Sequence, residues 1–151
     1  MRARQVIAGA ALALAAGALA ACGGNAGGPT RAEFIARGDA LCAQARKNTP
    51  RPPATRDPAR LAGYLDAVDR VSTATLARFG KLEAPHDLSG LAKRFLASAN
   101  ARLADVRRAR NAARRGDAAG LRAALAQQDR DAVRYRALAR QIGFKICGSG
   151  G

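Results

Sequence analysis

The chain has 151 residues, a formal net charge of +15, and 39 alanines but only six aromatic residues. Strands favour aromatic and β-branched side chains, whereas alanine, leucine and arginine are good helix formers. The composition therefore argues against a β-rich fold and predicts an all-α protein with the length of one domain.

The first 22 residues follow the order of an export signal. Arg2 and Arg4 supply positive charge, and residues 6–18 form an apolar run that is too short to span ~30 Å of hydrocarbon, which needs about 20 residues. The run leads into Leu19-Ala20-Ala21-Cys22. This pattern resembles the type II signal peptide (lipobox) of bacterial lipoproteins, in which leucine and two small residues precede the cysteine.

The resemblance implies that residues 1–21 are removed and that Cys22 begins the mature protein. In that family the cysteine sulfur carries diacylglycerol and the new amine is usually acylated, which implies a protein anchored at the extracytoplasmic face of the cell membrane. One acyl chain binds a membrane only marginally, whereas several on one residue hold it stably. The alternative is an uncleaved apolar helix ending in an ordinary cysteine. The alanine and arginine bias suggests an actinobacterial source.

After Cys22, residues 23–29 hold four glycines, a composition typical of a flexible tether. The mature chain would have 130 residues and a charge of +13, because Arg2 and Arg4 are lost from +15. We expect residues 22–29 to be the lipid-bearing cysteine and its tether, residues 30–147 the folded domain, and residues 148–151 a disordered tail.

Capping signals and periodic apolar residues predict two helices in the first half of the domain. Thr30 and Glu33 fit a capping box for a helix that ends near residue 47, before a proline-rich stretch. Asp57 and Pro58 begin the second helix. Its apolar side repeats at spacings of four and three up to residue 82, and we expect Ala84-Pro85 to end it.

The second half of the domain predicts two further long helices. The third begins at Asp87 and ends near Gly116, which suits the left-handed position after a helix. Asp117 caps the fourth helix, and Gly143 breaks it. We therefore expect a small four-helix bundle with one short and three longer helices.

The two remaining cysteines form a predicted disulfide. If Cys22 carries lipid, Cys42 and Cys147 are left as a pair in a disulfide-permissive compartment. The alternative is two free buried thiols. Because Cys42 lies three turns along its helix, the bridge requires one of two routes. Either the chain after Gly143 folds back along the first helix, which we favour, or the proline-rich linker crosses the length of the bundle.

Residues with catalytic potential are few. His86 is the single histidine, and without a second histidine or an acidic cluster we interpret it as a loop or cap residue. Ser72 and Thr75 interrupt the apolar side of the second helix; their hydroxyls either bond carbonyls one turn back or, with Gln128, line a pocket for a small apolar ligand. We expect no enzyme activity, catalytic residue, cofactor or metal.

Eleven arginines lie between residues 102 and 140, against four aspartates. Arg107, Arg110 and Arg114 share a helix face, and Arg115 adds charge at the hairpin tip. These four are candidate contacts to anionic lipid headgroups or a wall polymer; the alternative is a solvated, compositional face. Nucleic acid is disfavoured, since no stacking aromatics accompany the arginines. Together these features predict a lipid-anchored, non-enzymatic binding or structural module of the cell envelope, with no recognised family for the mature domain and an unknown protein partner.

Overall fold

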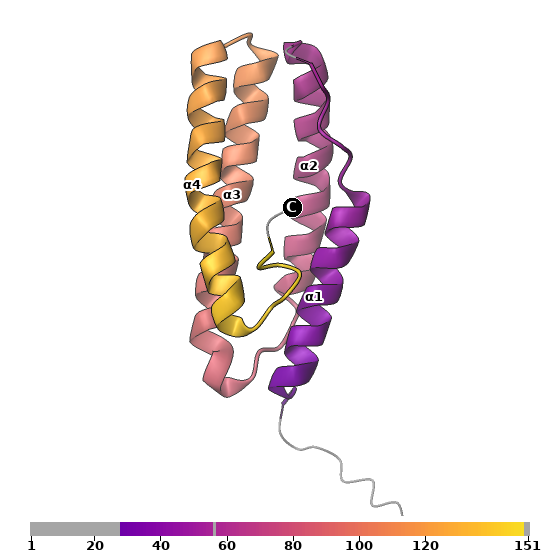
Figure 1. Cartoon of the computed structure of the whole chain (residues 1–151), viewed down its shortest axis with the longest axis vertical. Helices are drawn as coiled ribbons and strands as arrows, with labels where there is room; N and C mark the ends of the chain where they lie inside the picture. The colour runs from indigo at the N-terminus through magenta and orange to yellow at the C-terminus, as the bar shows by residue number, and fades with distance from the viewer. Residues whose placement is uncertain (1–27, 56, 150–151) are drawn as a thin grey trace, which may run out of the picture.

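Four amphipathic segments form the four predicted helices. The computed structural model describes residues 28–55 and 57–149, and within these ranges the chain is all-α, without strands (Figure 1). The helices are α1 (Arg31–Asn48), α2 (Pro58–Phe79), α3 (Ser89–Arg114) and α4 (Ala118–Ile142), with a short 3₁₀ turn, η1 (His86–Leu88), before α3. The predicted fold class, including one short helix and three longer ones, is confirmed.

The predicted caps form as expected. The hydroxyl of Thr30 accepts the Glu33 N–H at 3.3 Å, while the Thr30 N–H donates to the Glu33 carboxylate at 2.8 Å. Gly116 has a φ of 66°, and the Asp117 N–H reaches back to the Ala112 carbonyl at 2.9 Å, which closes α3 in a Schellman motif. Gly143 has a φ of 106° and ends α4 in the same way. These left-handed glycines turn the chain sharply at both ends of α4.

Two helix ends differ from the sequence-based expectation. We expected α2 to continue to Ala84-Pro85, but it ends at Phe79, and Leu82 donates its N–H to the Phe79 carbonyl at 3.0 Å. This tighter turn lets Leu82 pack against the core beyond the helix end. At the start of α3, the segment beginning at Asp87 is first a 3₁₀ turn, with Leu88 buried, and becomes α-helical at Ser89.

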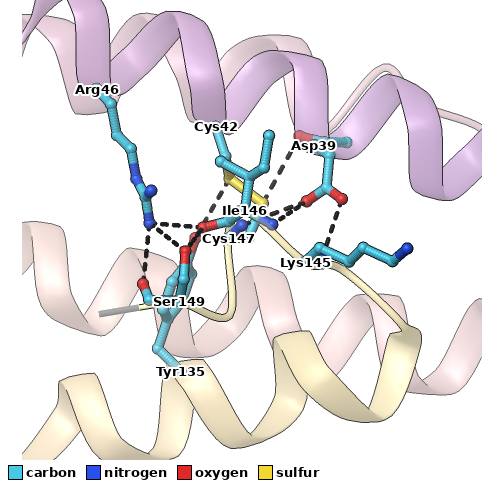
Figure 2. Close-up of a disulfide and its surroundings, with 9 residues drawn as sticks. Asp39, Cys42, Arg46, Tyr135, Lys145, Ile146, Cys147 and Ser149 are labelled. Carbon is cyan, nitrogen blue, oxygen red and sulfur yellow. Dashed lines mark hydrogen bonds between the residues drawn. A yellow bond between two sulfur atoms is a disulfide. The ribbon is translucent and has the colours of Figure 1, made fainter. Parts of the chain in front are cut away.

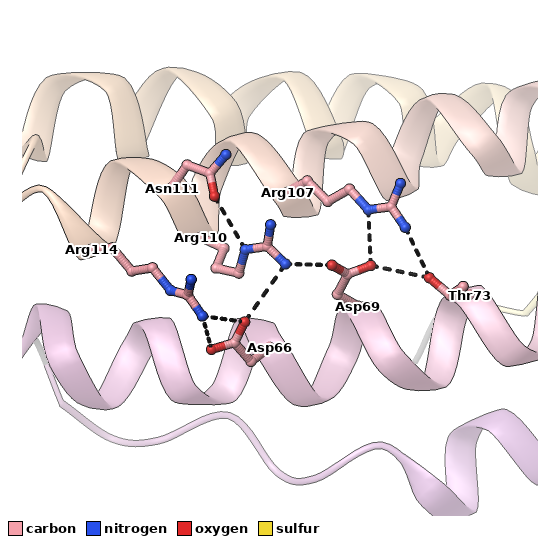
Figure 3. Close-up of polar contacts among 7 residues, drawn as sticks. All are labelled: Asp66, Asp69, Thr73, Arg107, Arg110, Asn111 and Arg114. Atoms are coloured by element: carbon pink, nitrogen blue, oxygen red, sulfur yellow. Dashed lines mark hydrogen bonds and ion pairs between the residues drawn. The ribbon is translucent and has the colours of Figure 1, made fainter.

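The connections explain how Cys147 reaches Cys42. The four helices run alternately up and down, so α4 ends beside the start of α1 (Figure 1). After Gly143 the chain folds back along α1, which is the route we favoured. The linker between α1 and α2 then runs on alone to the far end of the bundle, beside α2 (Figures 1 and 3). Consequently α1 lines only one half of the bundle.

Two apolar clusters occupy the two halves. We call the half around the larger cluster the cystine half; its cluster includes Phe34, Phe79, Phe95, Phe144 and the bridged pair Cys42 and Cys147. The other is the hairpin half, which contains the turn at Gly116 and a smaller cluster of Leu65, Val106, Ala109 and Ala124.

Candidate functional site

Cys22, the predicted lipid carrier, lies outside the described residues, as do residues 1–21, the predicted signal peptide. The described chain begins at Gly28, next to the start of α1 in the cystine half (Figure 1). Among the described residues, no helix is both long enough and apolar enough to cross a membrane.

The predicted disulfide between Cys42 and Cys147 is present, with Cα atoms 5.4 Å apart (Figure 2). Both cysteines are buried. The Tyr135 hydroxyl lies 3.7 Å from the Cys42 sulfur and is the donor, because a bridged sulfur carries no hydrogen. Gly38 allows the returning chain to approach, since a Cβ there would lie 2.3 Å from the ring of Phe144.

Two side chains of α1 hold the returning chain on either side of the bridge (Figure 2). The Asp39 carboxylate accepts the backbone N–H groups of Lys145 at 2.9 Å, Ile146 at 2.8 Å and Cys147 at 3.3 Å. Arg46 donates to the Ile146 carbonyl at 2.7 Å and to the Ser149 carbonyl at 2.9 Å.

This arrangement changes the predicted tail. We expected residues 148–151 to be disordered, but Gly148 is buried and Ser149 is bound by Arg46. Residues 150 and 151 lie outside the described residues. The ordered domain therefore extends to Ser149.

The predicted anionic-surface contacts lie largely in interhelical ion pairs (Figure 3). Arg107 donates to Asp69 at 3.0 Å, Arg114 donates to Asp66 at 2.7 Å, and Arg110 lies between them, 2.5 Å from Asp69. The three arginines share one face of α3, as predicted, but that face lies against α2. Their charge is therefore partly balanced by two aspartates.

Arg115 lies apart from these pairs, at the tip of the hairpin. Its guanidinium is 4.0 Å from Asp117, and both side chains are largely exposed. An exposed pair at this distance contributes little to stability, about 0–1 kcal/mol. The four predicted arginines therefore do not form a single uncompensated surface.

The ion pairs change the titration of Asp69. Partial burial acts to raise the pKa of Asp69, but hydrogen bonds from Arg107 and Thr73, with the charges of Arg107 and Arg110, outweigh it and hold the pKa below its ordinary value. The carboxylate is thus the favoured form in the folded protein.

A buried polar cluster between α3 and α4 was not predicted. Asp105 has no solvent exposure and accepts a hydrogen bond from Arg108, while its second oxygen, Oδ2, has no donor among the described residues. Burial raises the pKa of Asp105, and the neighbouring Asp131 carboxylate raises it further, although the charge of Arg108 acts to lower it.

The side chains around Asp105 belong to the same contact between α3 and α4. A hydrogen bond from Gln127 lowers the pKa of Asp131 despite partial burial, and the neighbouring Asp105 lowers it further. One turn before Asp105, the Arg102 guanidinium lies 4.8 Å from the centre of the Tyr135 ring, and burial lowers the pKa of Arg102. The signal was present in the sequence: Ser98, Arg102 and Asp105 repeat at spacings of four and three beside the apolar face of α3.

His86, Ser72, Thr75 and Gln128 are the residues considered for catalysis or a pocket. His86 is exposed at the start of η1, and within the described ranges no group of three or more His, Cys, Asp or Glu residues is placed to hold a metal. Thr75 donates its hydroxyl to the Val71 carbonyl at 2.8 Å, which is the first of the two interpretations offered above, and Ser72 and Gln128 are half-buried.

A groove instead lies between α1 and α2. The groove has a volume of about 410 Å³. Its lining consists of Arg37, Ala40, Leu41, Gln44, Arg78, Lys81 and Leu82. Neither Ser72, Thr75 nor Gln128 takes part.

No protein-family model, curated protein or solved structure matches this chain.

Proposed function

We propose that this protein is a lipoprotein, anchored by Cys22 at the extracytoplasmic face of a bacterial cell membrane, and that its bundle is a non-enzymatic binding or structural module of the cell envelope. The observation that carries the proposal is the Cys42–Cys147 disulfide. Disulfides persist in exported proteins and are rare in the reducing cytosol. The bridge therefore supports the export that the lipobox resemblance implies.

The cysteine count supports the same conclusion. The chain has three cysteines, and the bridge uses two. An odd cysteine in an exported protein calls for a separate role. Cys22 stands in the position that lipid attachment requires, directly after a leucine and two small residues.

The geometry weighs against the Arg107, Arg110 and Arg114 face as the main site for an anionic partner. These side chains bind Asp66 and Asp69, so an anion would have to compete with two carboxylates already in place. A small apolar ligand at Ser72, Thr75 and Gln128 gains no support either, because the groove lies elsewhere.

The test is the intact mass of the protein purified from bacterial membranes, measured with and without reductant and alkylation. We expect a chain that begins at Cys22 and carries at least diacylglycerol, and we expect two alkyl groups to be added only after reduction. Cys22→Ser is the control variant and should retain residues 1–21 and gain no lipid. A wild-type chain from Met1 with free thiols would contradict the proposal.

A further inference from the structure

The groove between α1 and α2 combines positive charge with an apolar floor. Leu41 is buried and Leu82 half-buried, and with Ala40 they form the apolar part of its lining. The rest of the lining is one amide and three cationic groups, without a carboxylate: Gln44, Arg37, Arg78 and Lys81. A site of this kind suits a ligand with both an anionic and an apolar part.

No carboxylate in the described part of the chain forms an ion pair with any of the three cations, Arg37, Arg78 and Lys81. All three side chains are exposed. Glu33, one turn before Arg37, is hydrogen-bonded to Thr30; the charge of Arg37 helps to lower the pKa of Glu33, but the two side chains form no ion pair. Arg78 donates to the Gln44 amide oxygen across the groove, so its guanidinium is positioned without being neutralised. Arg107, Arg110 and Arg114 differ in this respect, since the α2 carboxylates of Asp66 and Asp69 already bind them.

We propose that this groove binds the headgroup of an anionic glycerophospholipid at the membrane surface. The phosphate would lie among Arg37, Arg78 and Lys81, since guanidinium groups match phosphate geometry with paired N–H donors and lysine adds a point charge. The glycerol and the first acyl methylenes would cover Leu41 and Leu82. The attraction acts within about a Debye length, ~10 Å at 0.1 M salt.

The position of the groove also suits this ligand, an inference that rests on the proposed anchor at Cys22. Thr30 is eight positions beyond Cys22, a span of at most ~29 Å at about 3.6 Å per residue. Arg37 lies seven residues beyond Thr30, which is about 10 Å along the axis of α1. The anchor thus leaves enough chain for the bundle to lie with this groove against the headgroups.

Chemical labelling of the four lysines of the chain tests this proposal. Lys81 lines the groove, whereas Lys47, Lys93 and Lys145 do not, and all four are exposed. The lipid-bearing full-length chain is placed in vesicles of equal parts phosphatidylglycerol and phosphatidylcholine, or of phosphatidylcholine alone. Acetylation of each lysine by an amine-reactive ester is followed by mass spectrometry. We expect phosphatidylglycerol to slow acetylation of Lys81 about fivefold relative to the other three lysines, the protection given by ligand at about four times its dissociation constant.

Matched variants test the cations. Arg37→Gln and Arg78→Gln should each remove most of the selective protection of Lys81. Arg70→Gln should retain it, because Arg70 is also exposed on α2 but lies outside the lining. Thermal melting of each variant checks the fold. If Arg78→Gln lowers the melting temperature, the result for Arg37→Gln tests the proposal instead. Arg37 has no hydrogen-bond partner among the described side chains, so its replacement leaves none unsatisfied.

Three results would overturn the proposal. Equal protection of all four lysines would indicate a general surface effect. Equal protection of Lys81 in phosphatidylcholine alone would remove the role of headgroup charge. Protection by inorganic phosphate to the same extent would indicate a site for free anions.

An experiment with a soluble lipid tests binding in the groove independently of the proposed lipid anchor at Cys22. Dihexanoyl phosphatidylglycerol below its micelle concentration should protect Lys81 whether or not Cys22 carries lipid. An intact mass without diacylglycerol would overturn the anchor alone. Unprotected Lys81 in both lipid arms, with diacylglycerol present, would overturn the groove alone.

Discussion

The two halves of this bundle are held together by different chemistry. The cystine half contains a group of aromatic rings, which includes Phe95 and Phe144 with centroids 5.3 Å apart, and a disulfide. The hairpin half packs Leu65 and Val106 against alanines and places its charged residues in pairs between α2 and α3. Aromatic side chains bury 150–250 Å² each, whereas alanine buries little. The difference follows from the shortness of α1, which covers one half; in the other half the linker takes its place beside α2.

The largest expected difference between the halves concerns their apolar clusters. Phe95 is 2% exposed, with ring centroids 5.4 Å from Phe79 and 4.9 Å from Tyr135. Phe95→Ala should lower the free energy of unfolding by about 3–5 kcal/mol. Leu65→Ala, its counterpart in the hairpin half, should cost less, toward the lower end of about 2–5 kcal/mol, because its alanine neighbours allow the helices to close on the space. Urea unfolding at neutral pH, with the disulfide intact, measures both; a larger loss for Leu65→Ala would reverse the comparison.

Removing the bridge tests whether the cystine half depends on it. The two cysteines are 105 residues apart. Replacing both with alanine should cost about 2–5 kcal/mol, chiefly by freeing the unfolded chain. Thermal melting of the oxidised, reduced and doubly substituted proteins measures this loss.

The local consequence of that substitution should be confined to one half. Hydrogen exchange at the N–H of Ile146, which Asp39 holds, should accelerate more than exchange at the N–H of Asp117 in the hairpin turn. Oxidised and reduced proteins that melt at the same temperature would show that the cluster holds without the bridge.

The buried carboxyl group of Asp105, between α3 and α4, should make the free energy of unfolding depend on pH. The folded pKa of Asp105 is raised above its unfolded value of about 3.9, so its favourable contribution is complete below that value and is lost as pH rises through the folded pKa. Asp131 has a lowered pKa, and its contribution has the opposite sign. Asp105→Asn removes the first effect, together with the part of the second that Asp105 supplies. The wild type should therefore lose stability relative to Asp105→Asn as pH rises from about 4, by about 1–3 kcal/mol, the usual cost of a buried polar group without a partner.

Unfolding free energies across pH 4 to 8, taken as the difference between wild type and variant, measure this effect. Asp129→Asn is the control, because Asp129 is exposed on the same helix as Asp131. A difference that stays flat with pH would mean that Asp105 ionises as easily in the fold as in the unfolded chain.

The smallest expected effect concerns the ion pairs of the hairpin half. The Asp69 side chain is 13% exposed and that of Arg107 is 47% exposed, so solvent screens their attraction. Asp69→Asn should cost about 1 kcal/mol or less, and the cost should shrink at 1 M salt. Because the folded pKa of Asp69 is lowered, its contribution is present above the unfolded pKa and is lost as pH falls through the folded pKa. Urea unfolding at low and high salt measures it; a cost that salt does not change would point to packing.

Features that depend on neighbouring residues could be predicted from the sequence. Thr30 with Glu33, Asp57 with Pro58, and Gly116 with Asp117 mark helix ends because each cap is completed within a few residues. The disulfide was predictable by elimination among three cysteines. The early end of α2 was not, because Leu82 leaves the helix to reach a core built from distant segments.

Features that depend on the register between helices could not be predicted. Asp66 and Asp69 lie opposite Arg110 only because α2 and α3 pack at one particular offset, and periodicity within either helix does not set it. The same holds for the groove, where Arg37 and Arg78 meet from antiparallel helices. Asp105 could have been noticed by its spacing, but its neighbour Asp131 on α4 could not.

The span of the disulfide also sets an order of events during biosynthesis. Ribosomes add about 5–20 residues per second, so Cys42 is made about 5–20 s before Cys147, which follows 105 residues later. Throughout that interval the Cys42 thiol has no correct partner. The fold brings the two sulfurs together once α4 has formed and the chain beyond it has returned to α1, so we expect the bridge to close late and to seal the completed fold. Loss of thiol reactivity at Cys42 would therefore time the end of maturation in a living cell.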